Sequence, residues 1–151
     1  MKKFSKFLIV FIIGLVGFAT VPEGKADAAW SAWQSRDGFK AGCKVRVWVD
    51  AYSYSNAANT VDAKAEQNGS CGTIYYQMFL SSDGSDSVGA SDDLFTGNFN
   101  SSTPVKSFNI NTVKVNWTQN AVVYLYMYKT SNISGAWNTK VASHGITIAP
   151  Q

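Results

Sequence analysis

The fold class of this chain is decided by the segment Ala121-Val122-Val123-Tyr124-Leu125-Tyr126-Met127-Tyr128-Lys129. Before the lysine it has no glycine, proline or charge, and β-branched and aromatic residues dominate it, a composition typical of strands. Because successive strand side chains point to opposite faces, Val123, Leu125 and Met127 form one row and the three tyrosines form the other. The aliphatic row is expected in a core. The tyrosine row, with apolar bodies and polar tips, suits either a second buried layer or a solvated binding face.

Shorter segments with strand composition lie on both sides of this one. Alternating apolar and polar residues predict a strand over 43–54, and Gln119-Asn120 is expected to be a tight turn before Ala121. Further strands are expected at 61–66, 73–80, 94–99, 105–110 and 140–148. About seven to nine short strands, with no amphipathic helix beyond residue 28, predict an antiparallel β-sandwich of immunoglobulin-like or jelly-roll type. A closed barrel is the alternative.

The first 28 residues are typical of a secretory signal peptide. Three lysines in Met1–Lys6 precede the apolar run Phe7–Phe18, and Ala26-Asp27-Ala28 forms an A-x-A cleavage pattern. The apolar run ends too early for a membrane span, which needs about 20 apolar residues. We therefore expect residues 1–28 to be removed and residues 29–151 to form a single domain. The mature protein is expected to be secreted, extracellular and bacterial, without a stable membrane anchor.

The charge balance excludes one class of partner. Of the 13 basic and ten acidic residues, four basic and two acidic residues lie in the predicted signal peptide, so the mature chain has a net charge of about +1. Nucleic-acid-binding domains present clustered Lys and Arg on one face, and no such cluster remains here. The sequence therefore argues against nucleic acid as a partner.

The two cysteines, Cys43 and Cys71, predict a disulfide, because an even pair in an oxidising compartment is most simply bridged. A thiol nucleophile is the alternative, and it would need a reduced compartment and a histidine partner.

Catalytic residues are scarce in this sequence. The single histidine, His144, follows Ser143, but no motif supplies the third group that orients a nucleophile and its base. Asp50 and Asp62, on neighbouring predicted strands, could serve a glycosidase, although each occupies the polar side of a regular alternation. The sequence predicts a protein that is not an enzyme.

An aspartate-rich loop offers a weak metal site. Asp83, Asp86, Asp92 and Asp93 surround a glycine and several serines, and calcium binds such oxygen ligands. The spacing differs from that of an EF-hand, and the same residues are ordinary in turns. Calcium is therefore the only cofactor considered, and otherwise none is expected.

Aromatic residues supply the predicted binding site. If the valines of 45–49 face inward, Trp48 and Tyr52 face outward, and the same alternation brings Tyr75 and the tyrosine row outward. Were these strands neighbours, one sheet would present an aromatic face surrounded by amides and hydroxyls. The residues of this predicted face are Trp48, Tyr52, Tyr75, Tyr124, Tyr126 and Tyr128.

Such a face predicts a secreted binding protein. Aromatic rings with neighbouring hydrogen-bonding groups suit an extracellular glycan of a cell wall or matrix, and they equally suit a protein partner. The alternatives are a toxin or bacteriocin-like effector that acts on a membrane or receptor, a small hydrolase, and a self-assembling surface protein. A purely structural role for the tyrosines also remains open, because tyrosine is a favoured strand residue.

Overall fold

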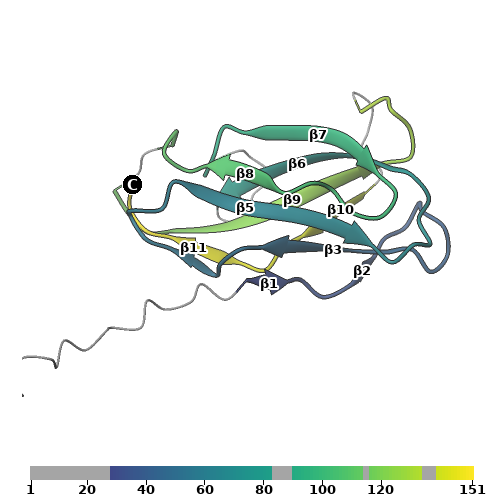
Figure 1. The fold of residues 1–151 in the computed structure, drawn as a ribbon, viewed down its shortest axis with the longest axis horizontal. Helices are drawn as coiled ribbons and strands as arrows, with labels where there is room; N and C mark the ends of the chain where they lie inside the picture. The colour runs from purple at the N-terminus through teal and green to yellow at the C-terminus, as the bar shows by residue number, and fades with distance from the viewer. Residues whose placement is uncertain (1–27, 83–89, 114–115, 134–138) are drawn as a thin grey trace, which may run out of the picture.

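The computed structural model describes residues 28–82, 90–113, 116–133 and 139–151. These residues form two stacked β-sheets (Figure 1), in agreement with the predicted β-sandwich. Nearly all of the predicted signal peptide lies outside the described residues, so that prediction is not tested here. None of the described segments is a helix with the length and apolar character needed to cross a membrane.

The first sheet, called sheet A, is built around β3 and β5. Its strand order is β1-β3-β5-β8, and β2 pairs with β3 beside β1; all of its pairs are antiparallel. The strands of sheet A are β1 (Ala29–Trp30), β2 (Gln34–Ser35), β3 (Lys44–Val49), β5 (Thr60–Gln67) and β8 (Lys106–Asn109).

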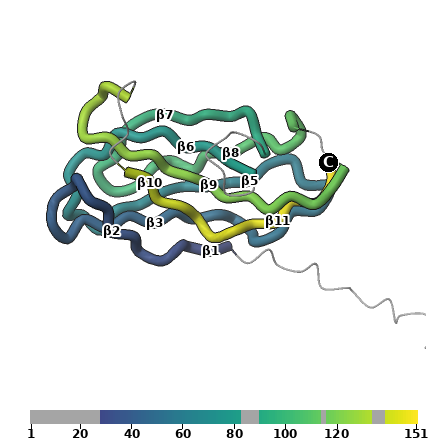
Figure 2. The backbone as a smooth tube through the Cα atoms, turned by 180° about the vertical axis from the view of Figure 1, so that it is seen from behind, coloured from purple at the N-terminus to yellow at the C-terminus, as the bar shows by residue number. Residues whose placement is uncertain are grey.

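The second sheet, called sheet B, is centred on β9 and lies behind sheet A in Figure 1 and nearest the viewer in Figure 2. Its order is β4-β11-β9-β6-β7, and β10 pairs with β9 next to β11. Among the strand pairs that the structure describes in sheet B, β4 and β11 alone run parallel. The strands of sheet B are β4 (Ser53–Tyr54), β6 (Ile74–Ser82), β7 (Leu94–Phe99), β9 (Gln119–Tyr128), β10 (Thr139–Ala142) and β11 (Ile146–Ile148).

The core lies between the two sheets and contains the aliphatic row predicted from the sequence. Val123 and Leu125 are 0% exposed and Met127 is 1% exposed. Val47 and Val49 of sheet A contribute to the same cluster. The two sheets are separate, so the sandwich prediction is confirmed over the closed barrel.

Three predicted boundaries differ from the structure. The expected strand over 43–54 divides, because β3 belongs to sheet A whereas β4 belongs to sheet B. Gln119 and Asn120 are not a turn; they begin β9 and pair with Ile148 and Thr147. The expected strand over 140–148 is interrupted between β10 and β11.

A disulfide joins Cys43 to Cys71, with the two Cα atoms 4.6 Å apart and a sequence separation of 28. It connects the start of β3 to the segment between β5 and β6. The predicted cysteine pairing is therefore confirmed.

Side chains from β2 and from the residue that follows it, Arg36, close one edge of the sandwich. Gln34 Nε2 donates to the Ala142 carbonyl oxygen at 2.7 Å, and the Ala142 amide donates to Gln34 Oε1 at 3.3 Å. Arg36 Nε donates to the Lys140 carbonyl oxygen at 2.6 Å. Because these groups point away from β9, the side chains take the place of a neighbouring strand. This set of contacts is called the β2–β10 clamp.

Candidate functional site

The residues of the predicted aromatic face lie on the outer surfaces of two different sheets. Trp48 is in β3 of sheet A, whereas Tyr75 and the tyrosine row are in β6 and β9 of sheet B. The outer surfaces of a sandwich face opposite directions, as Figures 1 and 2 illustrate. These residues therefore do not form one continuous face. That expectation required their strands to be neighbours in one sheet, and they belong to two.

The tyrosine row is mostly buried in a second aromatic cluster on sheet B. Tyr126 is 8% exposed and Tyr128 is 4% exposed, and both belong to a cluster with Phe79. The Phe79 and Tyr126 rings stack with centres 5.2 Å apart, and Tyr75 and Tyr124 pack partly buried against the cluster. These side chains point away from the main core, as expected, but they are not exposed to solvent because their rings cover one another.

Polar side chains contact the tyrosines of this cluster. The Tyr128 hydroxyl donates to Gln77 Oε1 at 2.7 Å, and burial raises the pKa of the Tyr128 phenol above its ordinary value. Lys140 Nζ lies 4.5 Å from the centre of the Tyr124 ring. Whether these tyrosines bind a ligand stays a prediction, but a ligand would find little of Tyr126 or Tyr128 accessible.

The outer surface of sheet A carries a different aromatic arrangement, formed by three tryptophans and two cations. Trp30 of β1 pairs with Trp48 of β3. The guanidinium carbon of Arg46 lies 4.3 Å from the Trp30 ring centre and 4.4 Å from the Trp33 ring centre. Lys64 Nζ lies 5.4 Å from the Trp30 ring centre and 5.3 Å from the Trp48 ring centre. Rings and cations thus share contacts in a set that we call the tryptophan ladder: Trp33, Arg46, Trp30, Lys64 and Trp48.

The register between β3 and β5 holds the cations of the ladder in place. Arg46 pairs with Glu66 across the two strands, and Trp48 pairs with Lys64. The Arg46 guanidinium forms an ion pair with Glu66, and its Nε donates to Glu66 Oε1 at 2.6 Å. Each cation–π contact at such distances contributes about 0.5–1 kcal/mol at an exposed site. The ladder is therefore a fixed surface and not a set of independent side chains.

Trp33 is the most accessible ring of the ladder. Its exposure is 41%, whereas Trp30 and Trp48 are half-buried. Trp30 forms cation–π contacts with both cations, whereas the cation–π contact of Trp33 is with Arg46. A ligand would therefore meet Trp33 first.

Sequence reasoning did not assign Trp30 and Trp33 to this surface. Residues three apart in a continuous strand point to opposite faces, so the spacing argues against a shared face. The chain instead breaks between β1 and β2, where the Ser31 hydroxyl oxygen accepts from the Val47 amide at 3.1 Å. The pair of tryptophans near the first strand was the one sequence signal for this surface. The sequence did not show that their segment pairs with β3, because that pairing joins residues far apart in the chain.

Tyr52 is exposed and lies close to the backbone of the ladder. It is 45% exposed, and its ring centre lies 5.8 Å from that of His144. His144 Nε2 lies 2.5 Å from the Trp30 carbonyl oxygen, so this nitrogen donates to it. Tyr52 is thus linked to the backbone of Trp30 through His144, and Trp48 is the residue of the predicted face that belongs to the ladder.

The groups considered for catalysis have structural contacts. The Ser143 hydroxyl donates to the His144 carbonyl oxygen at 2.6 Å and accepts from the Val123 amide at 3.0 Å. Asp50 Oδ1 accepts from the Tyr54 hydroxyl at 2.5 Å and from the Asp62 amide at 2.9 Å. These contacts hold the β10–β11 connection and the corner between β3 and β4.

The predicted calcium loop is described only in part. Asp83 and Asp86 lie outside the described residues, Asp92 is exposed, and Asp93 Oδ2 accepts from the Asn109 amide at 2.6 Å. Within the described ranges, no three residues of metal-binding type come together. Calcium binding here stays a prediction that the described residues do not test.

Comparison with known proteins places this fold in a family. The chain is 43% identical over 108 residues to a Bacillus subtilis (strain 168) protein named "Cell wall-binding protein YqgA", covering 70% of this chain and 71% of that protein. No solved structure matches the chain. A family model for the YqgA MG2 macroglobulin domain matches residues 26–149. This match spans both sheets and the tryptophan ladder, and the chain therefore belongs to the YqgA MG2 macroglobulin domain family.

Proposed function

We propose that this protein is an extracellular, non-enzymatic protein that binds the bacterial cell wall through the tryptophan ladder. The relative at 43% identity is named as a cell wall-binding protein. The observation that carries the choice of surface is the exposure of Trp33 at the edge of a rigid ring-and-cation array. The signal peptide predicted at residues 1–28 would export the protein, and disulfides such as Cys43–Cys71 are typical of oxidising compartments.

The chemistry of the ladder fits a wall glycan. The apolar C–H face of a sugar ring can stack on an aromatic ring, and its hydroxyl groups need nearby donors and acceptors. Trp33 supplies an accessible ring, Trp48 supplies an indole N–H at the other end of the ladder, and Tyr52 supplies a phenol. The rings are already held by Arg46 and Lys64, so binding would require little side-chain ordering.

Trp33→Ala is the variant that tests this surface, and Trp117→Ala is its matched control. Trp117 is also an exposed tryptophan, at 62%, but it is not part of the ladder. In sedimentation with purified Bacillus subtilis cell walls, we expect the wild-type protein and Trp117→Ala to pellet equally. Trp33→Ala should bind at least about tenfold more weakly, equivalent to about 1.4 kcal/mol.

Stability must be measured beside binding. Trp33 is largely exposed, so its removal should change the free energy of unfolding by about 1 kcal/mol or less. Trp30 is half-buried at the centre of the ladder and should not be used alone, because its loss would also disturb the fold. If a folded Trp33→Ala variant pellets like the wild type, the ladder is not the wall-binding surface. If the wild type itself does not pellet, wall binding is wrong.

A further inference from the structure

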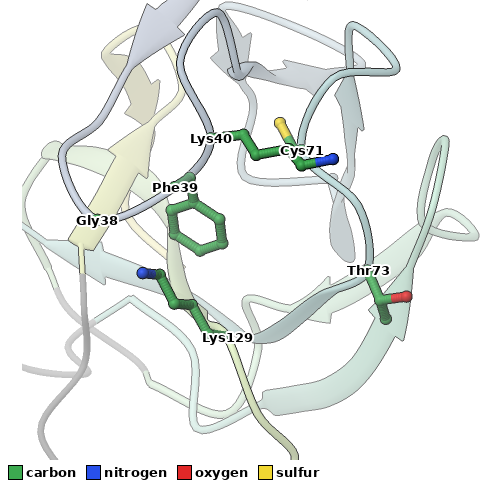
Figure 3. Close-up of a pocket in the computed structure, with 6 residues that line it drawn as sticks. All are labelled: Gly38, Phe39, Lys40, Cys71, Thr73 and Lys129. Atoms are coloured by element: carbon green, nitrogen blue, oxygen red, sulfur yellow. The ribbon is translucent and has the colours of Figure 1, made fainter.

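The connection between β5 and β6 carries the dipeptide Asn68-Gly69, which is the one Asn-Gly pair in the sequence. In such a pair the glycine amide nitrogen can attack the carbonyl carbon of the asparagine side chain, because glycine has no Cβ to hinder the approach. Asn68 and Gly69 are both exposed. Further along the same connection, Cys71 and Thr73 line a pocket of about 380 Å³ (Figure 3). The connection therefore has solvent and free space beside it.

Three hydrogen bonds hold the Asn68 side chain in one orientation. Its Nδ2 donates to the Gly42 carbonyl oxygen at 2.7 Å. Its Oδ1 accepts from the Lys44 amide at 3.2 Å and from the Ser70 amide at 3.3 Å. The opposite orientation would set the NH₂ group against two N–H donors, so the side-chain carbonyl must face the two amides.

The bond from the Ser70 amide makes a turn in which the asparagine side chain folds back on its own backbone. This turn keeps Asn68 Cγ beside the Gly69 nitrogen, because that nitrogen lies between the two ends of the bond. A Cβ built at Gly69 would have nothing within 4 Å. Of the residues that the structure describes, none accepts a hydrogen bond from the Gly69 amide. The attacking nitrogen is therefore accessible.

We propose that Asn68-Gly69 is a site of spontaneous deamidation that the fold promotes. The Gly69 nitrogen gives its proton to hydroxide and bonds to Asn68 Cγ. The bond from Cγ to Nδ2 then breaks, and Nδ2 takes a proton from water and leaves as ammonia. Water opens the resulting succinimide ring and leaves aspartate or isoaspartate at position 68. The negative charge that develops on Oδ1 during the attack meets two amide donors, an arrangement that stabilises oxyanions.

Conversion would remove contacts that the amide makes at the start of β3. A carboxylate has no N–H to donate to the Gly42 carbonyl oxygen, and the Lys44 amide that Oδ1 accepts from belongs to the first residue of β3. Cys43 lies between these two residues. Deamidation would therefore loosen the start of β3 beside the disulfide as each molecule ages. None of these residues belongs to the tryptophan ladder, so the proposal does not depend on wall binding.

Asn109 is a matched control within the same chain. Its Oδ1 also accepts from the amide two residues further on, that of Asn111, at 2.9 Å. The nitrogen that would have to attack belongs to Ile110, which is 1% exposed and donates to the Asn59 carbonyl oxygen at 3.1 Å. We therefore expect Asn109 to stay intact.

The test is incubation of the oxidised, folded protein in mildly alkaline buffer made with ¹⁸O-labelled water, followed by peptide mapping with mass spectrometry. Water supplies an oxygen to the product, so the label marks conversion that occurs during the incubation. The same incubation in urea, with the disulfide reduced, measures the unfolded chain. We expect Asn68 to convert in the folded protein at least as fast as in the unfolded chain, and Asn109 to remain unconverted in the folded protein.

Variants at Ser70 test the role of the amide donors. Ser70→Pro removes one donor and leaves Asn68-Gly69 in place, whereas Ser70→Ala keeps that amide and is its control. Conversion should be at least about tenfold slower in Ser70→Pro and unchanged in Ser70→Ala. Urea unfolding shows whether each variant is folded, and if Ser70→Pro is not, the comparison of folded with unfolded wild type decides. Asn68→Asp, which carries the carboxylate from the start, should unfold at a lower urea concentration than the wild type.

Two results would overturn the proposal. In the first, Asn68 converts more slowly in the folded than in the unfolded chain, which would mean that the fold protects it. In the second, folded Ser70→Pro converts as fast as Ser70→Ala, which would mean that the amide donors do not assist. An Asn68→Asp variant as stable as the wild type would overturn the loosening of β3. None of these results affects the sedimentation experiment on Trp33.

Discussion

At the scale of single residues, burial and pairing determine what each polar group does. The Tyr54 hydroxyl donates to Asp50, and both lie at the corner where the chain passes from β3 to β4. Burial, followed by this hydrogen bond, raises the pKa of Tyr54. Burial also raises the pKa of Tyr76 and Tyr128. The folded protein therefore keeps three phenols protonated at a pH where the unfolded chain ionises them.

This difference predicts a loss of stability in alkaline solution. The unfolded chain releases its tyrosine protons near pH 10, whereas the folded chain binds them more tightly. The folded state then binds more protons than the unfolded chain. The free energy of unfolding is therefore highest below about pH 10 and falls as the pH rises above it. Urea unfolding followed between about pH 8 and 11.5 should show this fall.

Tyr54→Phe is the variant that tests the largest contributor. It removes the phenol and should make the decrease above about pH 10 less steep, although it loses the hydrogen bond to Asp50 at every pH. The wild-type protein, unfolded by urea over the same pH range, is the control. An unchanged slope in Tyr54→Phe would contradict the assignment.

At the scale of strands, local alternation predicted β9 and β3 well but did not predict where the chain changes sheets. Val123, Leu125 and Met127 were expected in the core and are there. The apolar alternation of the segment 43–54 ends at Ala51, and the next buried residue is Tyr54, three positions further on, where the chain passes from β3 to β4 in the other sheet. This shift in phase was the local sign of the corner, but alternation reports only which side is apolar and both sheets face the same core, so it did not show that the chain changes sheets.

The disulfide acts at this same scale, because it ties β3 to the connection that follows β5. Replacing both Cys43 and Cys71 by alanine should lower the free energy of unfolding by about 3–4 kcal/mol, the value for closing a loop of this length in the chain-entropy model. Urea unfolding checks this value. Reducing agent should destabilise the wild type similarly and leave the double variant unchanged. A variant as stable as the oxidised wild type would contradict this account.

At the scale of the whole molecule, the candidate surfaces depend on pairing between distant segments, which local sequence patterns do not report. Tyr75 and Tyr128 meet because β6 pairs with β9, and Trp30 meets Trp48 because β1 pairs with β3. All of the predicted aromatic residues except Tyr52 are therefore strand residues, as expected, but the sandwich divides them between two faces. Identifying Trp33 required knowing that the first strand is interrupted.

The β2–β10 clamp predicts how the molecule avoids association. Gln34→Ala/Arg36→Ala would leave the outward amide and carbonyl groups of Lys140 and Ala142 without these side-chain partners. An exposed strand edge is a template for pairing with another chain. Light scattering at increasing protein concentration should therefore show a rise in mass for the double variant. Lys44→Ala, at an exposed residue of β3, is the control, and equal masses for all three proteins would contradict the prediction.

The clamp also sets an order of events in time. Gln34 and its partner Ala142 are 108 residues apart, and forming a contact between such distant residues costs loop-closure entropy. A chain made from its N-terminus must therefore wait for β10 before β2 can complete its hydrogen bonds. Trp33 directly precedes β2, so the ladder reaches its final form only when the last part of the domain is in place. The wall recognition proposed for Trp33 would thereby be restricted to completed molecules.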